Sequence, residues 1–586
     1  MEATDRTKSS GIAAYERKEY DTAIQTFLEL IRNGQADAEL YTVLGQAYRA
    51  KGRPNEASEA LNKAIAADPR NYKAQLTLGL VIARWGKAEE AIALLQRASQ
   101  LEPKDSTPFQ EIGHLLAIRG DLEPAIAQYE KARALAPNND HLLASLGELY
   151  VRKGDLDAAL DLFSQARRLA PNDPLHLLNI GDVYLRRSQA DQAFSLYQEA
   201  LGMKADYAPT HYHLGRYYLA LGQNEKSFQA FQESTRLDPE SADTCLGMGE
   251  VYERLGRNDA ALTEYKKAIE LEPGNALAND MMGLVHLKQG KLDMAQASFM
   301  NATRLNPKFT RAQYHLGQAW EKLGKVADAI GAYEKALMMD PSLTDVYVSL
   351  ANLYMSKGDL DRAGTYLDKA LPIAPNDAAL HANAARVALA KGDTARANQA
   401  IEKAQALQPD SPLVQRVLGE IHAAQGDHVA AAAAYGRAGA ASENDPAIMD
   451  ARAMALLAAG QHQEALDLID EAIKRSPGNA TLEYHAGLVL AAMGDENKAL
   501  DSMDEALRLD PELWDALYDI AVLLEKTGKR DKAFAVYDEF LEAGDQNKRP
   551  QDAKHEHALQ RYRAIREEIE SARKGGGFFK KLFGKK

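Results

Sequence analysis

A period of 34 residues runs through almost the whole chain, and it limits the possible folds more than any other feature of the sequence. Residues 242–275, ADTCLGMGEVYERLGRNDAALTEYKKAIELEPGN, form one copy, and repeat positions are counted from Ala242. Stepping by 34 from Gly11 finds glycine or alanine at position 8 of every copy up to Ala521. A fixed period of this length predicts a stack of similar supersecondary units, each of which contacts its neighbours.

Each copy predicts two helices joined by a turn. In residues 242–275 the first helix carries apolar residues at helical spacing, and Gly256 ends it because glycine takes a left-handed cap without strain. The second helix begins near Asn258, and Pro273 stops it because proline cannot donate the next helical hydrogen bond. Two short helices cannot bury both of their faces, so we expect the copies to stack into a solenoid.

Small and large side chains alternate at fixed repeat positions. Position 20 is alanine in every copy from Ala23 to Ala533 except at Ser227. Position 27 is alanine from the second copy to the fifteenth except at Ser234. Helices must cross closely where only a methyl group fits. Position 24 supplies the bulk between these crossings, with aromatic rings at Phe27, Tyr129, Phe163, Tyr197, Phe231, Tyr265, Phe299, Tyr333, Tyr435 and Tyr537.

This pattern resembles the tetratricopeptide repeat (TPR), whose consensus has small residues at positions 8, 20 and 27, aromatic residues near 11 and 24, and proline at 32. Sixteen copies span residues 4–547. The resemblance implies an all-α, right-handed α-solenoid superhelix, a long array of bacterial type whose first helices line a concave groove. The family's clamp for a chaperone's C-terminal carboxylate needs two asparagines, and this chain has Ile12 and Val43 at those positions.

The sequence predicts four parts. Residues 1–547 form the repeat array, and residues 548–574 form a helix whose apolar residues recur at three- and four-residue spacing, as expected of a cap on the last repeat. Residues 575–577 are three glycines, which predict a flexible linker. Residues 578–586, FFKKLFGKK, form a basic amphipathic tail.

The tail has an apolar side and a positively charged flank. On a helix the two sets would consist of Phe578, Phe579, Leu582 and Phe583, flanked by Lys580, Lys581, Lys585 and Lys586. Apolar burial together with attraction of lysine to anionic lipid predicts reversible attachment to a membrane surface. Docking into a groove of another protein and a disordered end are the alternatives.

Charge and composition limit the partners and the compartment. The net charge is -14, although residues 573–586 contain six basic and no acidic residues. An acidic array argues against phosphate-backbone binding along the groove, so no nucleic acid partner is expected. The N-terminus lacks an apolar run and Cys245 is the single cysteine, which favours a cytoplasmic protein, peripheral at the inner membrane through its tail.

No catalytic or metal-binding motif is found in the sequence. GxxxxGK[ST] and GxSxG are absent, and the HEHAL segment at residues 555–559 lacks the second histidine that would place two ligands on one helix face. We therefore expect no enzymatic activity, no cofactor and no metal site.

Partner contacts are predicted at positions 2, 5, 6, 9 and 13 of the first helices, because positions 4, 7, 8 and 11 are needed for packing. Aromatic and arginine side chains dominate binding hot spots, and amides can bond the backbone of an extended peptide. The candidates are Tyr212, His213, Arg216, Arg311, Tyr314, His315, Gln318, Asn352, Asn383 and Arg386. Polar side chains on a solvated face are the alternative interpretation.

Some charged residues on these faces have a local explanation. Acidic and basic residues four apart on one helix stabilise each other by about 0.2–0.5 kcal/mol. The sequence predicts three such pairs in first helices, Glu148 with Arg152, Asp182 with Arg186, and Glu250 with Arg254.

The sequence therefore predicts a non-enzymatic scaffold or adaptor. Its groove would bind extended segments or helices of other proteins, and its tail would attach it reversibly to the cytoplasmic face of a membrane. The alternative is a soluble, chaperone-like assembly adaptor whose C-terminal tail docks into a partner protein.

Overall fold

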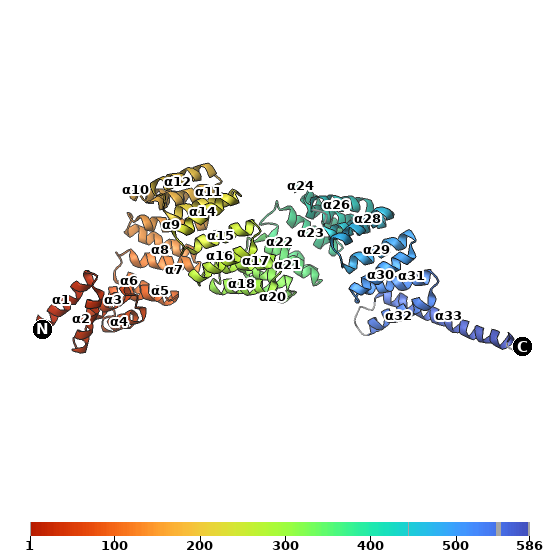
Figure 1. The fold of residues 1–586 in the computed structure, drawn as a ribbon, viewed down its shortest axis with the longest axis horizontal. Helices are drawn as coiled ribbons and strands as arrows, with labels where there is room; N and C mark the ends of the chain where they lie inside the picture. Colours follow the sequence, from red (N-terminus) through yellow and green to blue (C-terminus); the bar gives the residue numbers. More distant parts are fainter. Residues whose placement is uncertain (1, 443–444, 546–551, 584–586) are drawn as a thin grey trace. The chain divides into compact units, whose positions relative to one another are not determined.

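The computed structural model describes residues 2–442, 445–545 and 552–583, with the backbone alone for 2–6, 545 and 572–583. Within these residues it contains 33 α-helices and no strands. The chain divides into two compact units, residues 1–335 and 336–586, and within each unit the helices follow one another in chain order (Figure 1). The predicted all-α class is confirmed.

The helices of the first unit are α1 (Glu2–Glu16), α2 (Tyr20–Arg32), α3 (Ala38–Ala50), α4 (Pro54–Ala67), α5 (Tyr72–Ala83), α6 (Ala88–Leu101), α7 (Thr107–Arg119), α8 (Leu122–Leu135), α9 (Asp140–Lys153), α10 (Leu156–Leu169), α11 (Pro174–Arg186), α12 (Ala190–Met203), α13 (Ala208–Ala220), α14 (Asn224–Leu237), α15 (Ala242–Arg254), α16 (Asn258–Leu271), α17 (Ala276–Lys288), α18 (Leu292–Leu305) and α19 (Thr310–Lys322). The division between the units falls within α20 (Val326–Met339). The second unit continues with α21 (Thr344–Ser356), α22 (Leu360–Ala370), α23 (Ala378–Ala390), α24 (Thr394–Leu407), α25 (Pro412–Ala424), α26 (His428–Ala441), α27 (Pro446–Ala458), α28 (His462–Arg475), α29 (Ala480–Met493), α30 (Glu496–Leu509), α31 (Trp514–Lys526), α32 (Arg530–Asp545) and α33 (Ala553–Phe583).

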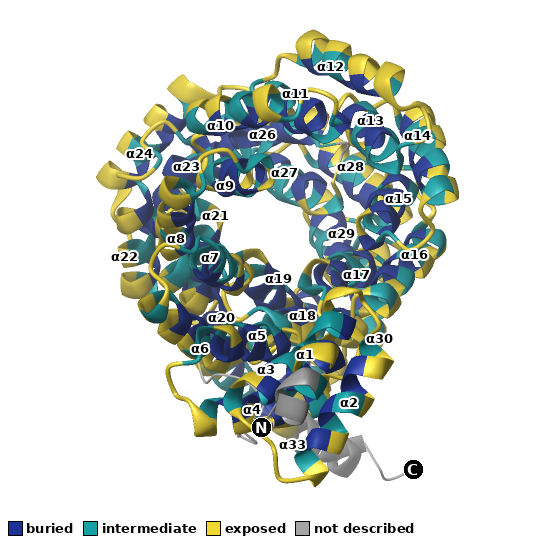
Figure 2. Ribbon diagram, turned by 90° about the vertical axis from the view of Figure 1, so that its left-hand side faces the viewer, coloured by how far each residue is buried: buried dark blue, intermediate teal, exposed yellow. Residues whose placement is uncertain are grey.

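Helices α1 to α32 alternate as the first and second helices of sixteen successive repeats, and within each unit the two helices of a repeat pack against each other, as α9 does against α10. In the copy at residues 242–275, α15 begins at Ala242, α16 begins at Asn258, and Leu271 ends α16 two residues before Pro273. Figure 2 shows that the first helix of a pair lies on the inner side and the second on the outer side, as with α9 and α10 in one unit and α23 and α24 in the other. The predicted solenoid of sixteen repeats is confirmed.

Glycine at position 8 lies directly under the large side chain at position 24. A Cβ atom added to Gly181 would lie 2.5 Å from Cε1 of Tyr197, and one added to Gly147 would lie 2.7 Å from Cε1 of Phe163. Both rings are buried. Carbon atoms cannot approach this closely, so the small residue at position 8 is required by the ring that covers it.

In the seventh repeat serine replaces alanine at two close helix crossings, and both serine hydroxyls have hydrogen-bond partners. Ser227 and Ser234 are both buried. The hydroxyl of Ser227 donates to the carbonyl of Gly215 at 2.8 Å, and that of Ser234 donates to the carbonyl of Ala208 at 3.1 Å. A buried hydroxyl with a partner avoids the cost of desolvation, so these positions keep the tight packing of the other repeats.

The turn between the two helices of a repeat needs a left-handed residue. Gly256 has φ 72°, and Ser188 adopts φ 61° at the same position of the sixth repeat. A left-handed conformation is strained for serine. The turn geometry is therefore imposed on Ser188 by the packing of α11 against α12.

One contact in the first unit joins repeats that are far apart in the sequence. Lys308, between α18 and α19, forms an ion pair with Asp121, which lies between α7 and α8 and is 187 residues away. Asp121 also pairs with Arg119. The expectation that each repeat contacts only its neighbours does not hold here, because the winding of this unit brings two distant turns together.

Helix α33 packs against α32 at the end of the array. Ala558 and Ile565 are buried in the same core cluster as Tyr537. The rings of Phe534 and Tyr562 stack with their centroids 4.4 Å apart. The apolar face of α33 thus covers the last repeat, the place that the sequence assigns to residues 548–574.

The backbone of α33 stays helical through Gly575, Gly576 and Gly577 and ends at Phe583. The linker expected at residues 575–577 is therefore not a break in the structure. Glycine weakens a helix by about 1 kcal/mol relative to alanine but can adopt helical dihedrals, and here it lies between longer helical segments. Among the described helices, none has both the length and the apolar character needed to cross a bilayer.

Candidate partner-binding surface

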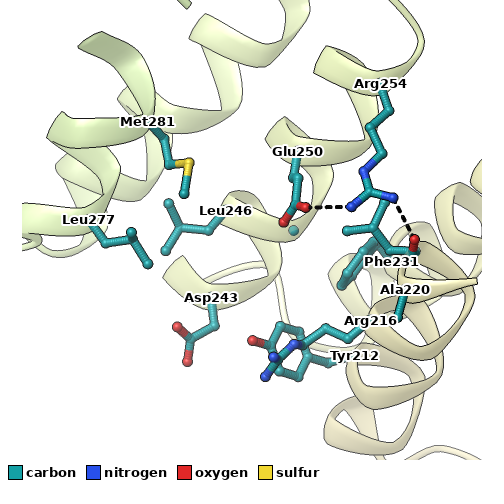
Figure 3. A pocket seen from close by; sticks show the side chains of 12 residues that line it. Tyr212, Arg216, Ala220, Phe231, Asp243, Leu246, Glu250, Arg254, Leu277 and Met281 are labelled. Atoms are coloured by element: carbon teal, nitrogen blue, oxygen red, sulfur yellow. Dashed lines mark hydrogen bonds and ion pairs between the residues drawn. The ribbon is translucent and has the colours of Figure 1, made fainter. Parts of the chain in front are cut away.

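The first helices of three consecutive repeats, α13, α15 and α17, surround a pocket of about 350 Å³ (Figure 3). It is lined by Tyr212, Arg216, Leu219, Ala220, Phe231, Asp243, Leu246, Gly247, Glu250, Arg254, Leu277 and Met281. Most of these residues occupy the repeat positions that the sequence assigns to the groove, and Tyr212 and Arg216 are two of the predicted contact residues.

Tyr212 and Arg216 form one side of this pocket. The Tyr212 ring packs at 5.9 Å from the ring of Phe231, and the guanidinium of Arg216 lies 5.9 Å from the centroid of Tyr212. Burial acts to lower the pKa of Arg216, but Tyr212 and Asp182 raise it, and the net shift is upward. The Arg216 side chain is 46% exposed, so a charged donor stacked on an aromatic ring is open to a partner.

Leu246, Leu277 and Met281 form the apolar side of the pocket, opposite Arg216 (Figure 3). Leu277 is 40% exposed although it is a large apolar residue. An open apolar wall beside an aromatic ring and an arginine is a combination typical of binding hot spots.

Arg254 has a structural role at the edge of the pocket. One of its guanidinium nitrogens donates to the carbonyl of Leu219 at 2.6 Å, and another lies 3.1 Å from Glu250. The pair predicted between Glu250 and Arg254 is therefore confirmed. Arg152 likewise donates to the carbonyl of Ala117 in the preceding first helix at 3.2 Å. These arginines satisfy carbonyls at helix C-termini, where a positive charge is favourable.

Asp182 lies behind Arg216 and connects three elements. It accepts a hydrogen bond from the hydroxyl of Tyr197 at 2.7 Å, and Nδ1 of His213 lies 2.9 Å from the same carboxylate oxygen. Arg216 is 3.9 Å from the other oxygen. Burial acts to raise the pKa of Asp182, but His213 and Arg216 lower it, and the net shift is downward. Asp182 thus contacts His213 of the next first helix, whereas the sequence predicted that it pairs with Arg186 on its own helix.

The four candidates on α19 have different environments. Arg311 is exposed, Gln318 is half-buried, and the half-buried Tyr314 packs with its ring 5.7 Å from that of Tyr333. His315 is buried, and its Nδ1 lies 2.8 Å from a carboxylate oxygen of the fully buried Asp280. His315 therefore does not present its ring to the groove as predicted.

The three candidates in the second unit also differ in their burial and in their hydrogen bonds. Asn352 is half-buried on α21, whereas Asn383 on α23 is buried and donates to the carbonyl of Ala379 at 2.9 Å. Arg386 lies 3.4 Å from the side-chain oxygen of Asn383 and 3.5 Å from Glu420. Asn383 thus bonds to the backbone of its own helix, and its contact with a partner stays a prediction.

Repeat position 6 holds the two buried candidates, His315 and Asn383, and also the partly buried His213. His213, His315 and His485 all occupy this position, and each contacts an aspartate of the preceding first helix. In these three copies the side chain at position 6 therefore faces the preceding first helix, whereas Met281, at the same position of α17, lines the pocket. The sequence signal for these contacts is an aspartate 31 or 35 residues before each histidine, a spacing close to one repeat.

One group of side chains in the described residues has metal-ligand chemistry. Ligand atoms of Asp140, Asp173 and His176 lie within 4.8 Å of one another. His176 Nε2 is 3.1 Å from Asp140, and Asp173 caps α11 by accepting from the backbone of Leu175 at 2.9 Å. Pairing and helix capping account for this arrangement.

The side chains of the tail lie outside the part of the chain that the structure describes. The helical backbone of α33 includes the positions of Phe578, Phe579, Lys580, Lys581, Leu582 and Phe583, whereas Lys585 and Lys586 lie outside the described residues. The predicted amphipathic face of the tail stays a prediction.

Comparison with known families decides the classification. A tetratricopeptide repeat model matches more than half of the chain, at residues 42–106, 178–242, 281–344, 383–446, 451–512 and 484–548. The chain belongs to the tetratricopeptide repeat family. Three other models of the same repeat match residues 322–387, 139–206 and 254–290 of this TPR protein. Since tetratricopeptide repeats bind other proteins, this TPR chain is a protein-interaction scaffold.

Several solved structures are similar to this TPR protein. The APC/C hetero-tetramer Cut9-Hcn1 matches with a TM-score of 0.46 and 16% identity, over 83% of this chain and 96% of that chain. A tetratricopeptide repeat protein from Parabacteroides merdae ATCC 43184 matches with a TM-score of 0.40 and 18% identity, over 42% and 98%. Naa15/Naa10 bound to HypK-THB matches with a TM-score of 0.35 and 15% identity, over 98% and 97%. The comparison with curated proteins finds no match.

Proposed function

We propose that this TPR protein is a non-catalytic cytoplasmic scaffold that binds segments of partner proteins on the inner side of its first helices. The observation that carries the proposal is the pocket on α13, α15 and α17, where Arg216 stacked on Tyr212 faces the apolar side chains of Leu277 and Met281. A partner segment would place an apolar side chain against the leucine and methionine and a carbonyl or carboxylate on the arginine.

Substitution of the exposed pocket residues tests this proposal. Arg216→Ala combined with Leu277→Asp should weaken the complex with a co-purified partner by about 2 kcal/mol or more, because a hot-spot arginine and its apolar neighbour are both lost. Arg97→Ala is the matched control, since Arg97 is exposed on the outer helix α6. Affinity is measured by titration calorimetry, with circular dichroism to show that helicity is kept. Equal affinity in all three proteins would remove the pocket from partner binding.

We propose further that the tail, residues 578–586, attaches the protein reversibly to the anionic inner face of a membrane. The support is the sequence pattern of four apolar residues flanked by four lysines. Phe578→Ala with Phe579→Ala should weaken sedimentation with anionic and neutral liposomes alike. Lys580→Gln with Lys581→Gln should weaken it only with anionic liposomes at low salt, because salt screens the charge term alone.

The liposome experiment also tests the alternative function. If the full chain sediments with neither anionic nor neutral liposomes, the membrane proposal fails. The tail would then be assigned to a groove on a partner protein, as in a soluble assembly adaptor.

A further inference from the structure

A second pocket lies on the first helices near the N-terminal end of the first unit. Helices α3, α5 and α7 surround about 430 Å³ of space lined by residues of both polar and apolar character. This volume falls in the range of about 300–1,000 Å³ that is usual for ligand-binding clefts. The polar side chains at this pocket are Arg49, Arg84, Glu111 and His114.

The two arginines of this pocket differ from others on first helices. Arg152, Arg254 and Arg386 are bonded to carbonyls or carboxylates of the protein. Arg49 and Arg84 are exposed, and within the described part of the chain neither guanidinium group makes a hydrogen bond or ion pair. In a chain with a net charge of -14, two arginines that line one pocket and pair with no acid of the described residues form a local excess of positive charge. Glu111 offsets only one of these charges.

Apolar side chains stand beside the arginines. Leu80, Leu115 and Ile118 line the same pocket, and Ile118 is 66% exposed. A large apolar residue at this exposure next to free guanidinium groups calls for a ligand with both an apolar and an anionic part. Nucleic acid fits poorly, because an apolar wall offers nothing to phosphates and the surrounding array is acidic.

We propose that this arginine pocket, defined by Arg49, Arg84, Leu80, Leu115 and Ile118, binds an acidic, leucine-containing segment of a partner protein. Carboxylate side chains would make charge-assisted, bidentate hydrogen bonds to Arg49 and Arg84. The aliphatic side chain beside them would cover Ile118. The inference rests on the proposed function in one respect, that partner segments bind along the first helices, and it adds the chemistry that such a segment must have.

Fluorescence anisotropy with three labelled peptides tests the arginine pocket on the full-length protein. The peptides share the same leucines and differ only in carrying glutamate, glutamine or lysine at the other positions. The glutamate peptide should bind, and Arg49→Gln with Arg84→Gln should weaken its binding at least tenfold. Arg70→Gln with Arg97→Gln is the matched control, because it removes two exposed positive charges of the same repeats away from the pocket and should leave binding unchanged.

Several results would overturn the proposal. These are absence of binding of the glutamate peptide, equal binding of the glutamine peptide, or unchanged affinity in the Arg49→Gln, Arg84→Gln variant. Full competition by a single-stranded oligonucleotide would assign the arginines to phosphate instead. If Arg216→Ala with Leu277→Asp abolishes peptide binding while the Arg49 and Arg84 changes do not, the segment binds in the other pocket, and the proposed function stands without this inference.

Discussion

At the scale of single residues, the first helices are held together by polar contacts that cross from one repeat to the next. Asp182 is the best connected of these groups, with Tyr197 and His213 within hydrogen-bonding distance. Its lowered pKa means that the ionised carboxylate is more stable in the folded protein than in the unfolded chain. This difference makes the contribution of Asp182 depend on pH.

Asp182→Asn should reduce stability at neutral pH but not in acid. The unfolded carboxylate has a pKa of about 3.9, so its stabilising contribution is present above that value and is lost as the pH falls through the lower, folded-state pKa. Hydrogen bonds to a charged group contribute about 1.5–3 kcal/mol, which sets the expected loss at pH 7. Hydrogen exchange in α11 and α13 measures it, with the exposed Asp293→Asn as control. An equal loss above and below the pKa would show that the charge has no part in the effect.

At the scale of elements, the solenoid depends on how closely the two helices of a repeat approach each other. Phe163 on α10 lies so near the backbone of α9 that a Cβ at Gly147 would be 2.7 Å from its ring. A Cβ atom added to Gly331, on α20, would have no neighbouring heavy atom within 4 Å. The same substitution should therefore have opposite effects at the two positions.

Gly147→Ala should destabilise its repeat by about 1–3 kcal/mol, because the buried Phe163 ring has to move. Gly331→Ala should stabilise its helix by about 0.5–1 kcal/mol, since alanine loses less backbone entropy than glycine. Native-state hydrogen exchange of the two helix pairs compares the changes locally, which matters because a repeat array opens in parts. Destabilisation of both repeats to the same degree would contradict the argument from close approach.

At the scale of the whole molecule, the first unit contains a contact that a simple chain of neighbouring repeats does not have. Lys308 and Asp121 form an ion pair although eleven helices, α8 to α18, lie between them in the sequence, and Arg119 shares the carboxylate. Exposed ion pairs contribute little energy individually, about 0–1 kcal/mol. The pair therefore shows that two distant turns of this unit lie close together but adds little to its stability. Salt should weaken the attraction between Lys308 and Asp121.

A zero-length carbodiimide cross-linker should join Lys308 to Asp121, because it couples an amine to a carboxylate that it touches. Mass spectrometry of the digested protein should find this cross-link at low salt and less of it at high salt. Lys308→Gln should remove it while leaving the cross-link between Lys391 and Asp361, which lie 2.8 Å apart in neighbouring repeats of the second unit. Absence of the Lys308 cross-link under conditions that give the Lys391 cross-link would show that this unit winds differently in solution.

The 34-residue pattern is enough to predict the repeat, its two helices and the core between them. The alternation of Gly147 or Gly181 with a ring sixteen residues later is local information, because close approach of two helices and the turn between them act within one copy. Backbone hydrogen bonds and steric exclusion therefore fix each unit, and repetition fixes the array. The pocket residues Tyr212 and Arg216 were found by the same reasoning, since they lie at positions that the core leaves free.

The contacts between successive repeats cannot be predicted from the period, because they depend on how the repeats are rotated against each other. The rotation from one first helix to the next places His315 against Asp280 of the preceding first helix, where its ring is buried, whereas Met281 at the same repeat position lines the pocket. It also leaves Arg49 and Arg84 without an acidic partner among the described side chains, and it brings Lys308 to Asp121. These outcomes depend on the angle between successive repeats, which results from many small packing contacts and has no signature in the 34-residue period.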